Sequence, residues 1–159
     1  MLEAVVALAR AVFALVYLAL LVWAAYVDAQ SRVIPNASVV ALALWGLVGH
    51  IPFVLGFLPP FLPSLSSCVI SAVAVVAVFL AFEMVWRTVN KGRHGMGMGD
   101  IKLVGAVCLA MGPWAFPCFA AACLSAVFIE TLRHNRTFAF GPYLCACFAV
   151  CLIYLVVSN

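Results

Sequence analysis

The sequence contains very little charge. Of its 159 residues, 8 are lysine or arginine and 5 are aspartate or glutamate, so only 8% of the chain is charged. Soluble domains carry roughly 25% charged residues, and a soluble fold of this length could not bury a chain that is 69% hydrophobic. The composition therefore predicts an all-α, polytopic integral membrane protein, a bundle of about six transmembrane helices of about 20 residues each. The net charge of +3 is too small and too dispersed to indicate a nucleic-acid-binding protein.

Metal and disulfide motifs are also lacking. No C-x-x-C pair occurs, and no histidine or carboxylate cluster lies near a cysteine. In an apolar environment a free cysteine behaves as a small buried hydrophobic residue. We therefore expect no metal and no cofactor, and a packing role for the seven cysteines. These are Cys68, Cys108, Cys118, Cys123, Cys145, Cys147 and Cys151.

Uncharged stretches and prolines divide the chain into spans. Residues 37–82 contain no charged side chain, which is too long for one span and suits two. Pro59, Pro60 and Pro63 predict the turn between these two spans, because proline cannot continue a helix. Gly112-Pro113 predicts a further break for the same reason. We expect one transmembrane domain over residues 1–159, with spans at about 8–28, 37–58, 64–87, 100–115, 116–133 and 138–157.

The basic residues predict the orientation of these spans. With six spans, seven of the eight basic residues lie on one side of the membrane or near it: Arg32, Arg87, Lys91, Arg93, Lys102, Arg133 and Arg136. Only Arg10 does not. Cytoplasmic loops are enriched in lysine and arginine, so this side is expected to be cytoplasmic and both termini are expected outside.

Two short polar strings interrupt the apolar sequence, and each contains one aspartate. Asp28 opens the string over residues 28–36, and Asp100 lies within the glycine-rich string over residues 95–103. The predicted topology puts both at the cytoplasmic face. Each has a structural alternative: Asp100 is a suitable helix N-cap, and Asp28 could pair with Arg32 four residues on. Carboxylates next to lipid are nevertheless costly and usually have a function.

A pair of aspartates is sufficient to hydrolyse a peptide bond. Two nearby carboxylates cannot both ionise, so one keeps a proton. The ionised member takes a proton from water, and the protonated member donates to the substrate carbonyl oxygen. Gly97 and Gly99 would let the backbone or an extended substrate approach closely. Asp28 and Asp100 are therefore the predicted catalytic residues.

Three strings together carry a resemblance to a known family. They are Gly97-Met98-Gly99-Asp100, which matches the G-x-G-D signature of membrane aspartic proteases and is followed by Lys102 and Leu103; Asp28 near Ile34-Pro35-Asn36; and Phe140-Gly141-Pro142-Tyr143-Leu144. In this order on a six-span chain, they closely resemble the type IV prepilin peptidases.

The resemblance implies an aspartic endopeptidase that cleaves prepilins or pseudopilins after a glycine, at the cytoplasmic face of a prokaryotic cytoplasmic membrane. It implies Asp28 and Asp100 as the catalytic pair. Gly97, Gly99 and Lys102 would shape the loop and the approach of the substrate, together with Pro35 and Asn36. Larger family members have an additional N-terminal region, often with C-x-x-C pairs, and also methylate the new N-terminus. The sequence lacks this region and the C-x-x-C pairs, which predicts a peptidase-only minimal form.

Two other classes of protein remain open at this point. Intramembrane carboxylates also serve proton-coupled transporters, although no internal repeat is evident. A noncatalytic assembly factor of a pilus or secretion machine is the second alternative, and an archaeal preflagellin peptidase is a related enzyme.

The remaining polar residues have local interpretations. Glu83 lies four residues before Arg87 and can pair with it on one helix face. Glu130 can pair in the same way with Arg133 or His134. Lys102 is expected either to extend toward the lipid headgroups or to orient the Asp100 loop.

Overall fold

The chain folds into helices joined by short connections. The computed structural model describes residues 2–55, 62–90, 97–133 and 139–158, and these contain no strand. The helices are α1 (Leu2–Ser31), α2 (Asn36–Val48), α3 (Ile51–Val54), α4 (Leu65–Val89), α5 (Met98–Met111), α6 (Ala115–Arg133) and α7 (Gly141–Ser158), with a 3-10 turn, η1 (Gly112–Trp114), between α5 and α6. The all-α prediction is confirmed.

The outer surface of the bundle is apolar. Four helical segments in the described ranges are long and apolar enough to cross a membrane, namely Glu3–Ser31, Leu65–Val89, Met98–Leu132 and Gly141–Ser158, and α2 is a shorter apolar helix. Large apolar side chains such as Leu8, Leu124 and Val157 are strongly exposed on them. Such a surface suits contact with lipid, which agrees with the predicted polytopic membrane protein. The assignment of six spans stays a prediction.

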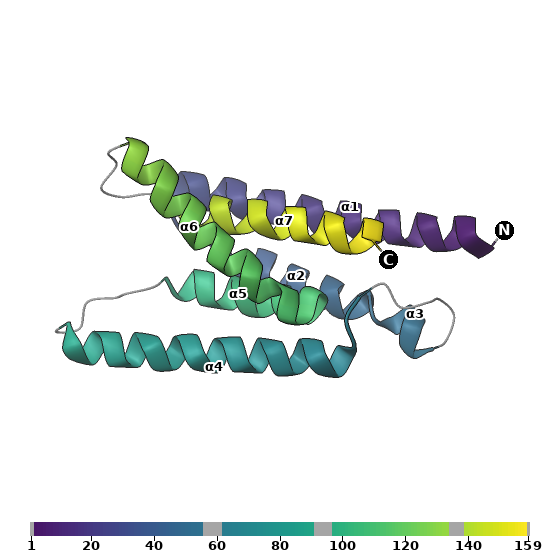
Figure 1. Ribbon diagram of the computed structural model, residues 1–159, viewed down its shortest axis with the longest axis horizontal. Helices are drawn as coiled ribbons and strands as arrows, with labels where there is room; N and C mark the ends of the chain where they lie inside the picture. Colours follow the sequence, from purple (N-terminus) through teal and green to yellow (C-terminus); the bar gives the residue numbers. More distant parts are fainter. Residues whose placement is uncertain (1, 56–61, 91–96, 134–138, 159) are drawn as a thin grey trace.

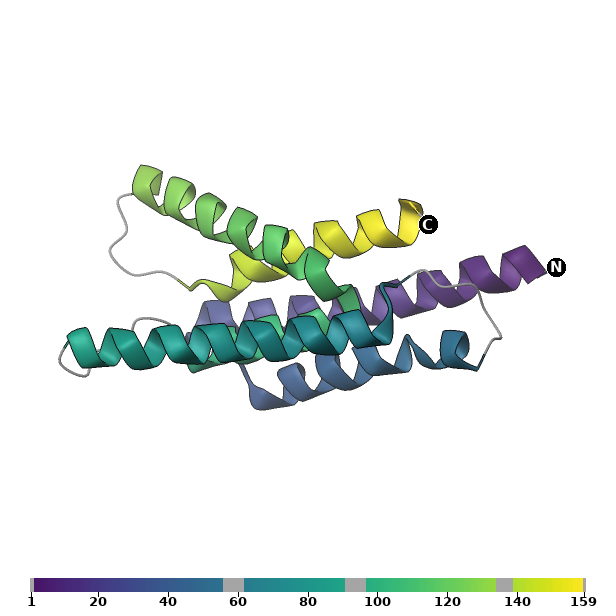
Figure 2. The same cartoon turned by 60° about the horizontal axis from the view of Figure 1, so that its bottom comes forward.

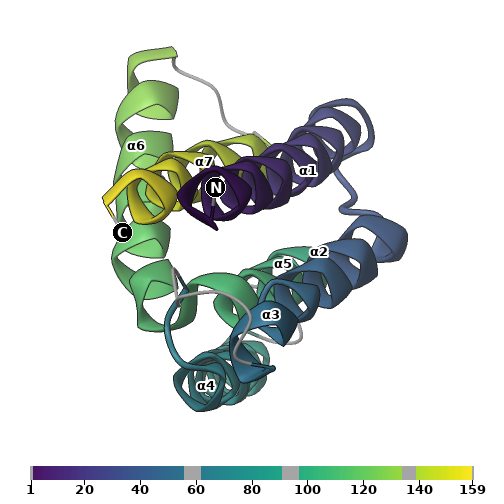
Figure 3. The same ribbon diagram turned by 90° about the vertical axis from the view of Figure 1, so that its right-hand side faces the viewer.

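The helices run alternately in opposite directions along the long axis of the molecule (Figure 1). Viewed end on, α1 and α7 lie side by side over a second group formed by α2, α5 and α4, and α6 lies along one flank (Figure 3). After a turn of the view, α6 is seen to cross α7 at an angle (Figure 2). As a result, one end of the bundle gathers the end of α1, the start of α2, the start of α5, the end of α6 and the start of α7.

Two helix ends differ from the expected bounds. α1 continues to Ser31, about one turn beyond Asp28, and ends where Arg32 takes a positive φ of 55° and donates its N–H to the Asp28 carbonyl at 2.8 Å. The expected span over 37–58 is interrupted, because α2 ends at Val48 and a turn at residues 49–50 precedes α3. The predicted turn at Pro59-Pro60 lies outside the described residues.

A sharp break separates α5 from α6. Gly112 has φ 55° and ψ −133°, a conformation that glycine adopts without strain, and Pro113 has no N–H to donate to the Leu109 carbonyl. The Nε2 of buried His50 lies 2.9 Å from that carbonyl oxygen and donates in place of the missing N–H. α6 can therefore turn back toward the end of the bundle at which α5 began.

α5 forms the centre of the bundle. It packs between α2 and α4, and residues 103–108 are buried without interruption. With 14 residues it is only about 21 Å long, shorter than the roughly 30 Å hydrocarbon core. Its first turn, which carries Asp100, is consequently held among other helices.

Candidate active site

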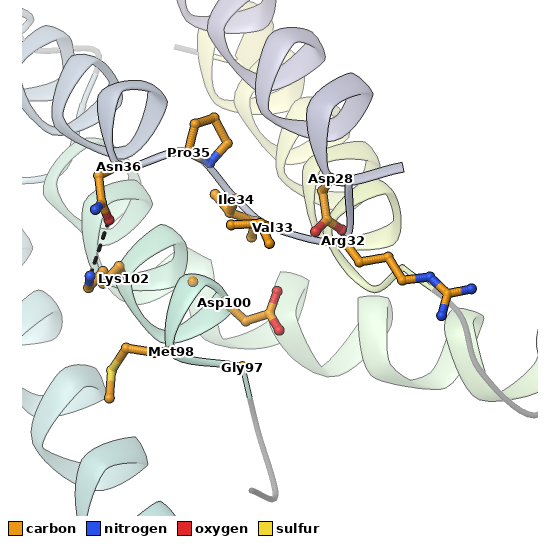
Figure 4. A pocket seen from close by; sticks show the side chains of 11 residues that line it. Asp28, Arg32, Val33, Ile34, Pro35, Asn36, Gly97, Met98, Asp100 and Lys102 are labelled. Atoms are coloured by element: carbon orange, nitrogen blue, oxygen red, sulfur yellow. Dashed lines mark hydrogen bonds between the residues drawn. The ribbon is translucent and has the colours of Figure 1, made fainter. Parts of the chain in front are cut away.

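The two polar strings meet in one cavity at the end of the bundle. The cavity has a volume of about 450 Å³ and is lined by residues from the end of α1, the α1–α2 link and the start of α5. Figure 4 shows the carboxylates of Asp28 and Asp100 pointing toward one another across it. The two groups are close enough for an electrostatic interaction. Two acidic side chains far apart in sequence thus share one site.

The Asp28 side chain is held by a hydrogen bond from the start of α7, outside both polar strings. The side chain is only 5% exposed, and the backbone N–H of Gly141, at the start of α7, donates to Asp28 Oδ2 at 2.9 Å. A Cβ atom on residue 141 would lie 2.6 Å from the same oxygen and 2.9 Å from Asp28 Cγ. Glycine is required here, because any larger residue would push the carboxylate out of position.

Asp100 has more freedom. It lies in the first turn of α5, where the helix dipole favours a carboxylate, and its own N–H donates to the Gly97 carbonyl at 3.1 Å. Its side chain is partly exposed to the cavity, and within the described residues its carboxylate accepts no hydrogen bond. A Cβ atom on residue 97 would lie 2.8 Å from Asp100 Oδ2. Gly97 thus leaves room for this carboxylate to turn.

The α1–α2 link brings the two strings together. Ile34 is buried and packs on the first turn of α5, where a Cβ atom on Gly99 would lie only 3.1 Å from Ile34 Cβ. Contacts this close are tighter than side chains normally make. Gly99 therefore allows the link to lie directly against the helix that carries Asp100.

The cations of the cavity lie away from the carboxylates. Lys102 Nζ donates to Asn36 Oδ1 at 3.1 Å, which joins α5 to the start of α2. The Arg32 side chain points away from both aspartates (Figure 4), and the alternative Asp28–Arg32 ion pair is absent among the described residues. The predicted Glu83–Arg87 pair is confirmed, at 2.8 Å on α4.

All seven residues named from the sequence line this one cavity: Asp28, Pro35, Asn36, Gly97, Gly99, Asp100 and Lys102. No catalytic or positioning role for Gly141 is predicted from the sequence. Its string, Phe140 to Leu144, was part of the family resemblance, but nothing in the local pattern pointed to an N–H aimed at Asp28. Within the described residues, no group of three or more His, Cys, Asp or Glu side chains could hold a metal ion.

Two carboxylates facing each other across a cavity at the end of an apolar helical bundle define a membrane site that can exchange protons with water. The chain belongs to the type IV leader peptidase family, whose family model matches residues 15–157. The predicted resemblance is thereby confirmed.

Two curated relatives are similar to most of this chain. Both bear the name prepilin leader peptidase/N-methyltransferase. The protein from Dichelobacter nodosus is 29% identical over 136 residues, which cover 83% of this chain and 45% of the relative. The protein from Neisseria gonorrhoeae is 31% identical over 134 residues, which cover 82% of this chain and 44% of the relative. The chain thus spans less than half the length of the curated relatives it matches. No solved structure matches it.

Proposed function

We propose that this protein is a membrane-embedded aspartic endopeptidase that removes the leader peptide of type IV prepilins or pseudopilins by cutting after a glycine. The observation that carries the proposal is the pair formed by Asp28 and Asp100 across one cavity. Membership of the type IV leader peptidase family and the names of the two relatives support the substrate class.

The dyad supplies acid and base together. It carries one proton, which belongs to the pair of carboxylates rather than to either residue alone. The ionised carboxylate takes a proton from a water molecule as the water oxygen bonds to the carbonyl carbon of the scissile peptide, while the other carboxylate protonates the carbonyl oxygen. As the resulting diol collapses, the carboxylate that is now ionised takes a proton from a diol hydroxyl, the other carboxyl gives its proton to the leaving nitrogen, and the C–N bond breaks. The dyad then again holds one proton, and no covalent intermediate or cofactor is needed.

The surroundings of the dyad suit an extended peptide. Gly97 lies exposed at the rim of the cavity, opposite the non-helical link over residues 33–35. Without a Cβ atom, Gly97 lets a second backbone approach the Asp100 carboxylate. A glycine before the scissile bond would fit this narrow approach for the same reason.

The charges favour a cytoplasmic site. Arg32 and Lys102 line the cavity, and Arg87 lies near the end of α4 at the same end of the bundle. Basic residues gather on the cytoplasmic side of membrane proteins. The leader would then be removed at the inner face of the prokaryotic cytoplasmic membrane, while the apolar helix of the prepilin stays in the lipid.

Single substitution of either aspartate tests the proposal. In proteoliposomes with a prepilin that contains leader, glycine and apolar helix, Asp28→Ala and Asp100→Ala should each reduce cleavage by roughly 10²–10⁴-fold or abolish it, because each removes one half of the acid–base pair. Glu3→Ala is the matched control, since Glu3 is an exposed acidic residue at the opposite end of α1 and should leave cleavage unchanged. Cleavage at the wild-type rate by either aspartate variant would refute the dyad. A metal chelator should have no effect.

A further inference from the structure

The hydrogen bond that fixes Asp28 comes from the first turn of α7. This turn begins at Gly141, and the connection before it, residues 134–138, lies outside the described residues. The position of the Gly141 N–H depends on how the described part of this turn is attached to its neighbours. Among the described residues, a side-chain contact on each side of Gly141 attaches this turn to α6.

The first attachment is polar. The Tyr143 hydroxyl donates to Glu130 Oε1 on α6 at 2.5 Å. Glu130 is only 7% exposed, and it belongs to a segment long and apolar enough to cross the membrane. An acidic residue in such a place is costly unless it has a partner and a function. The sequence predicts a partner for Glu130 on its own helix, Arg133 or His134, whose side chains lie outside the described residues, whereas Tyr143 joins it to a second helix.

The second attachment is aromatic. Phe140, directly before Gly141, packs edge-to-face on Phe119 of α6, with ring centroids 6.2 Å apart. Phe119 in turn packs on Phe79 of α4 at 4.9 Å. Aromatic pairs at these distances add to the energy of apolar burial. Gly141 thus lies between two contacts that tie its turn to α6.

We infer that Glu130 and Tyr143 are positioning residues for the catalytic dyad: their hydrogen bond fixes the first turn of α7 and thereby holds the Gly141 N–H on Asp28. The inference rests on the proposed function. Tyr143 lies two residues from Gly141, or about 3 Å along the helix axis, so a shift of the tyrosine moves the N–H with it. A misplacement of about 1 Å at a catalytic group can reduce the rate roughly 10²-fold. Neither side chain lines the Asp28–Asp100 cavity, so neither is placed among the groups around the two carboxylates.

Removal of one hydroxyl tests this inference. Tyr143→Phe should lower kcat for prepilin cleavage about five- to tenfold with KM unchanged, because Asp28 is held less well while the walls of the cavity stay intact. Tyr154→Phe is the matched control, since this tyrosine lies on the same helix, is 61% exposed and makes no hydrogen bond within the described residues. It should leave kcat unchanged. A wild-type kcat in Tyr143→Phe, an equal loss in Tyr154→Phe, or failure of Tyr143→Phe to accumulate in the membrane would overturn the inference.

Combination with Gly141→Ala separates positioning from general stabilisation. If Tyr143 acts through Gly141, then Tyr143→Phe should cause almost no further loss of kcat in the Gly141→Ala background, because the contact it supports is already displaced. A full additional loss in the double variant would contradict the inference. Glu130→Gln keeps an oxygen that can accept from Tyr143, and it should retain most of the wild-type kcat. A loss in Glu130→Gln as large as that in Tyr143→Phe would also contradict it.

Hydrogen exchange separates failure of this inference from failure of the proposed function. Deuterium uptake over residues 139–144 should rise in Tyr143→Phe and not in Tyr154→Phe, whether or not the prepilin is a substrate. Unchanged uptake in Tyr143→Phe would refute the positioning role while leaving the peptidase proposal intact. If the wild-type protein does not cleave prepilin but uptake rises in Tyr143→Phe, the peptidase proposal is refuted. The Glu130–Tyr143 hydrogen bond would then have only a structural role in holding the first turn of α7.

Discussion

The surroundings of the two aspartates are markedly different. Asp28 is almost fully buried near the end of the long α1 and accepts a hydrogen bond from the backbone of α7. Asp100 lies in the first turn of the short α5, partly exposed to the cavity and without a hydrogen bond to its carboxylate among the described residues. One carboxylate is therefore fixed by the fold, and the other has room to turn toward water and substrate. In the proposed reaction, the fixed member would keep its orientation while the other adjusts to the bound peptide.

Replacement of each aspartate by glutamate, which is one methylene longer, should give the largest difference in cleavage rate between the two positions. Asp28→Glu should lose cleavage almost as completely as Asp28→Ala, roughly 10²–10⁴-fold, because the extra carbon has no room beside Gly141. Asp100→Glu should keep more activity than Asp28→Glu, since its carboxylate faces the open cavity. Initial rates of prepilin cleavage measure both. Equal losses in the two glutamate variants would show that Asp100 is held as firmly as Asp28.

Substitution of the glycine beside each carboxylate also tests which of the two carboxylates is fixed. Gly141→Ala should lower kcat roughly 10²-fold, because the new Cβ would collide with Asp28 Oδ2 and Cγ, which are held in a buried site. Gly97→Ala places its Cβ close to Asp100 Oδ2 as well, but that carboxylate can rotate into the cavity, so the loss should be several times smaller. A single-turnover assay with saturating prepilin gives the two values. A larger loss in Gly97→Ala would reverse the assignment of the fixed and adjustable members.

The smallest expected effect concerns the hydrogen bond between Lys102 and Asn36, which joins α5 to the start of α2. Lys102→Met removes the hydrogen bond to Asn36 but keeps the length of the side chain, and one such bond contributes about 0.5–1.5 kcal/mol. We expect a two- to threefold loss of cleavage, and the same loss in Asn36→Ala. The double variant should be no worse than either single one, because both remove the same bond. A loss in Lys102→Met comparable to that in Asp100→Ala would give the lysine a direct catalytic role.

The composition and the prolines were sufficient to predict the helical class of the fold and one of its breaks. Long uncharged stretches predicted helices, and α5 and α6 separate where Gly112 and Pro113 predicted a break. The helix ends were less predictable. α1 continues about one turn beyond Asp28 and ends before Arg32, which has a positive φ. The sequence did not predict this end, because arginine has no special preference for positive φ. α2 stops at Val48 although the apolar sequence continues, and only the contact between His50 and the Leu109 carbonyl shows what that turn does.

The candidate site was predicted in its residues but not in its geometry. The two aspartates and their neighbours were named from local strings, and they line one cavity. The contacts that organise them join residues far apart in the chain, such as Gly141 with Asp28 and Tyr143 with Glu130. The position of a backbone N–H cannot be read from the sequence. In an apolar helix, a tyrosine whose hydroxyl joins two helices looks the same in sequence as a tyrosine that only packs.

By itself, the amino-acid sequence determined that this chain is a helical membrane protein of the type IV leader peptidase family, with one acidic residue in each of two polar strings. Composition and local motifs carry that information because lipid allows so few charged residues to remain. Only the tertiary structure decided that Asp28 is the fixed member of the pair and Asp100 the adjustable one. That distinction arises from the packing of α7 against α1 and α6, and packing depends on which helix faces meet in space.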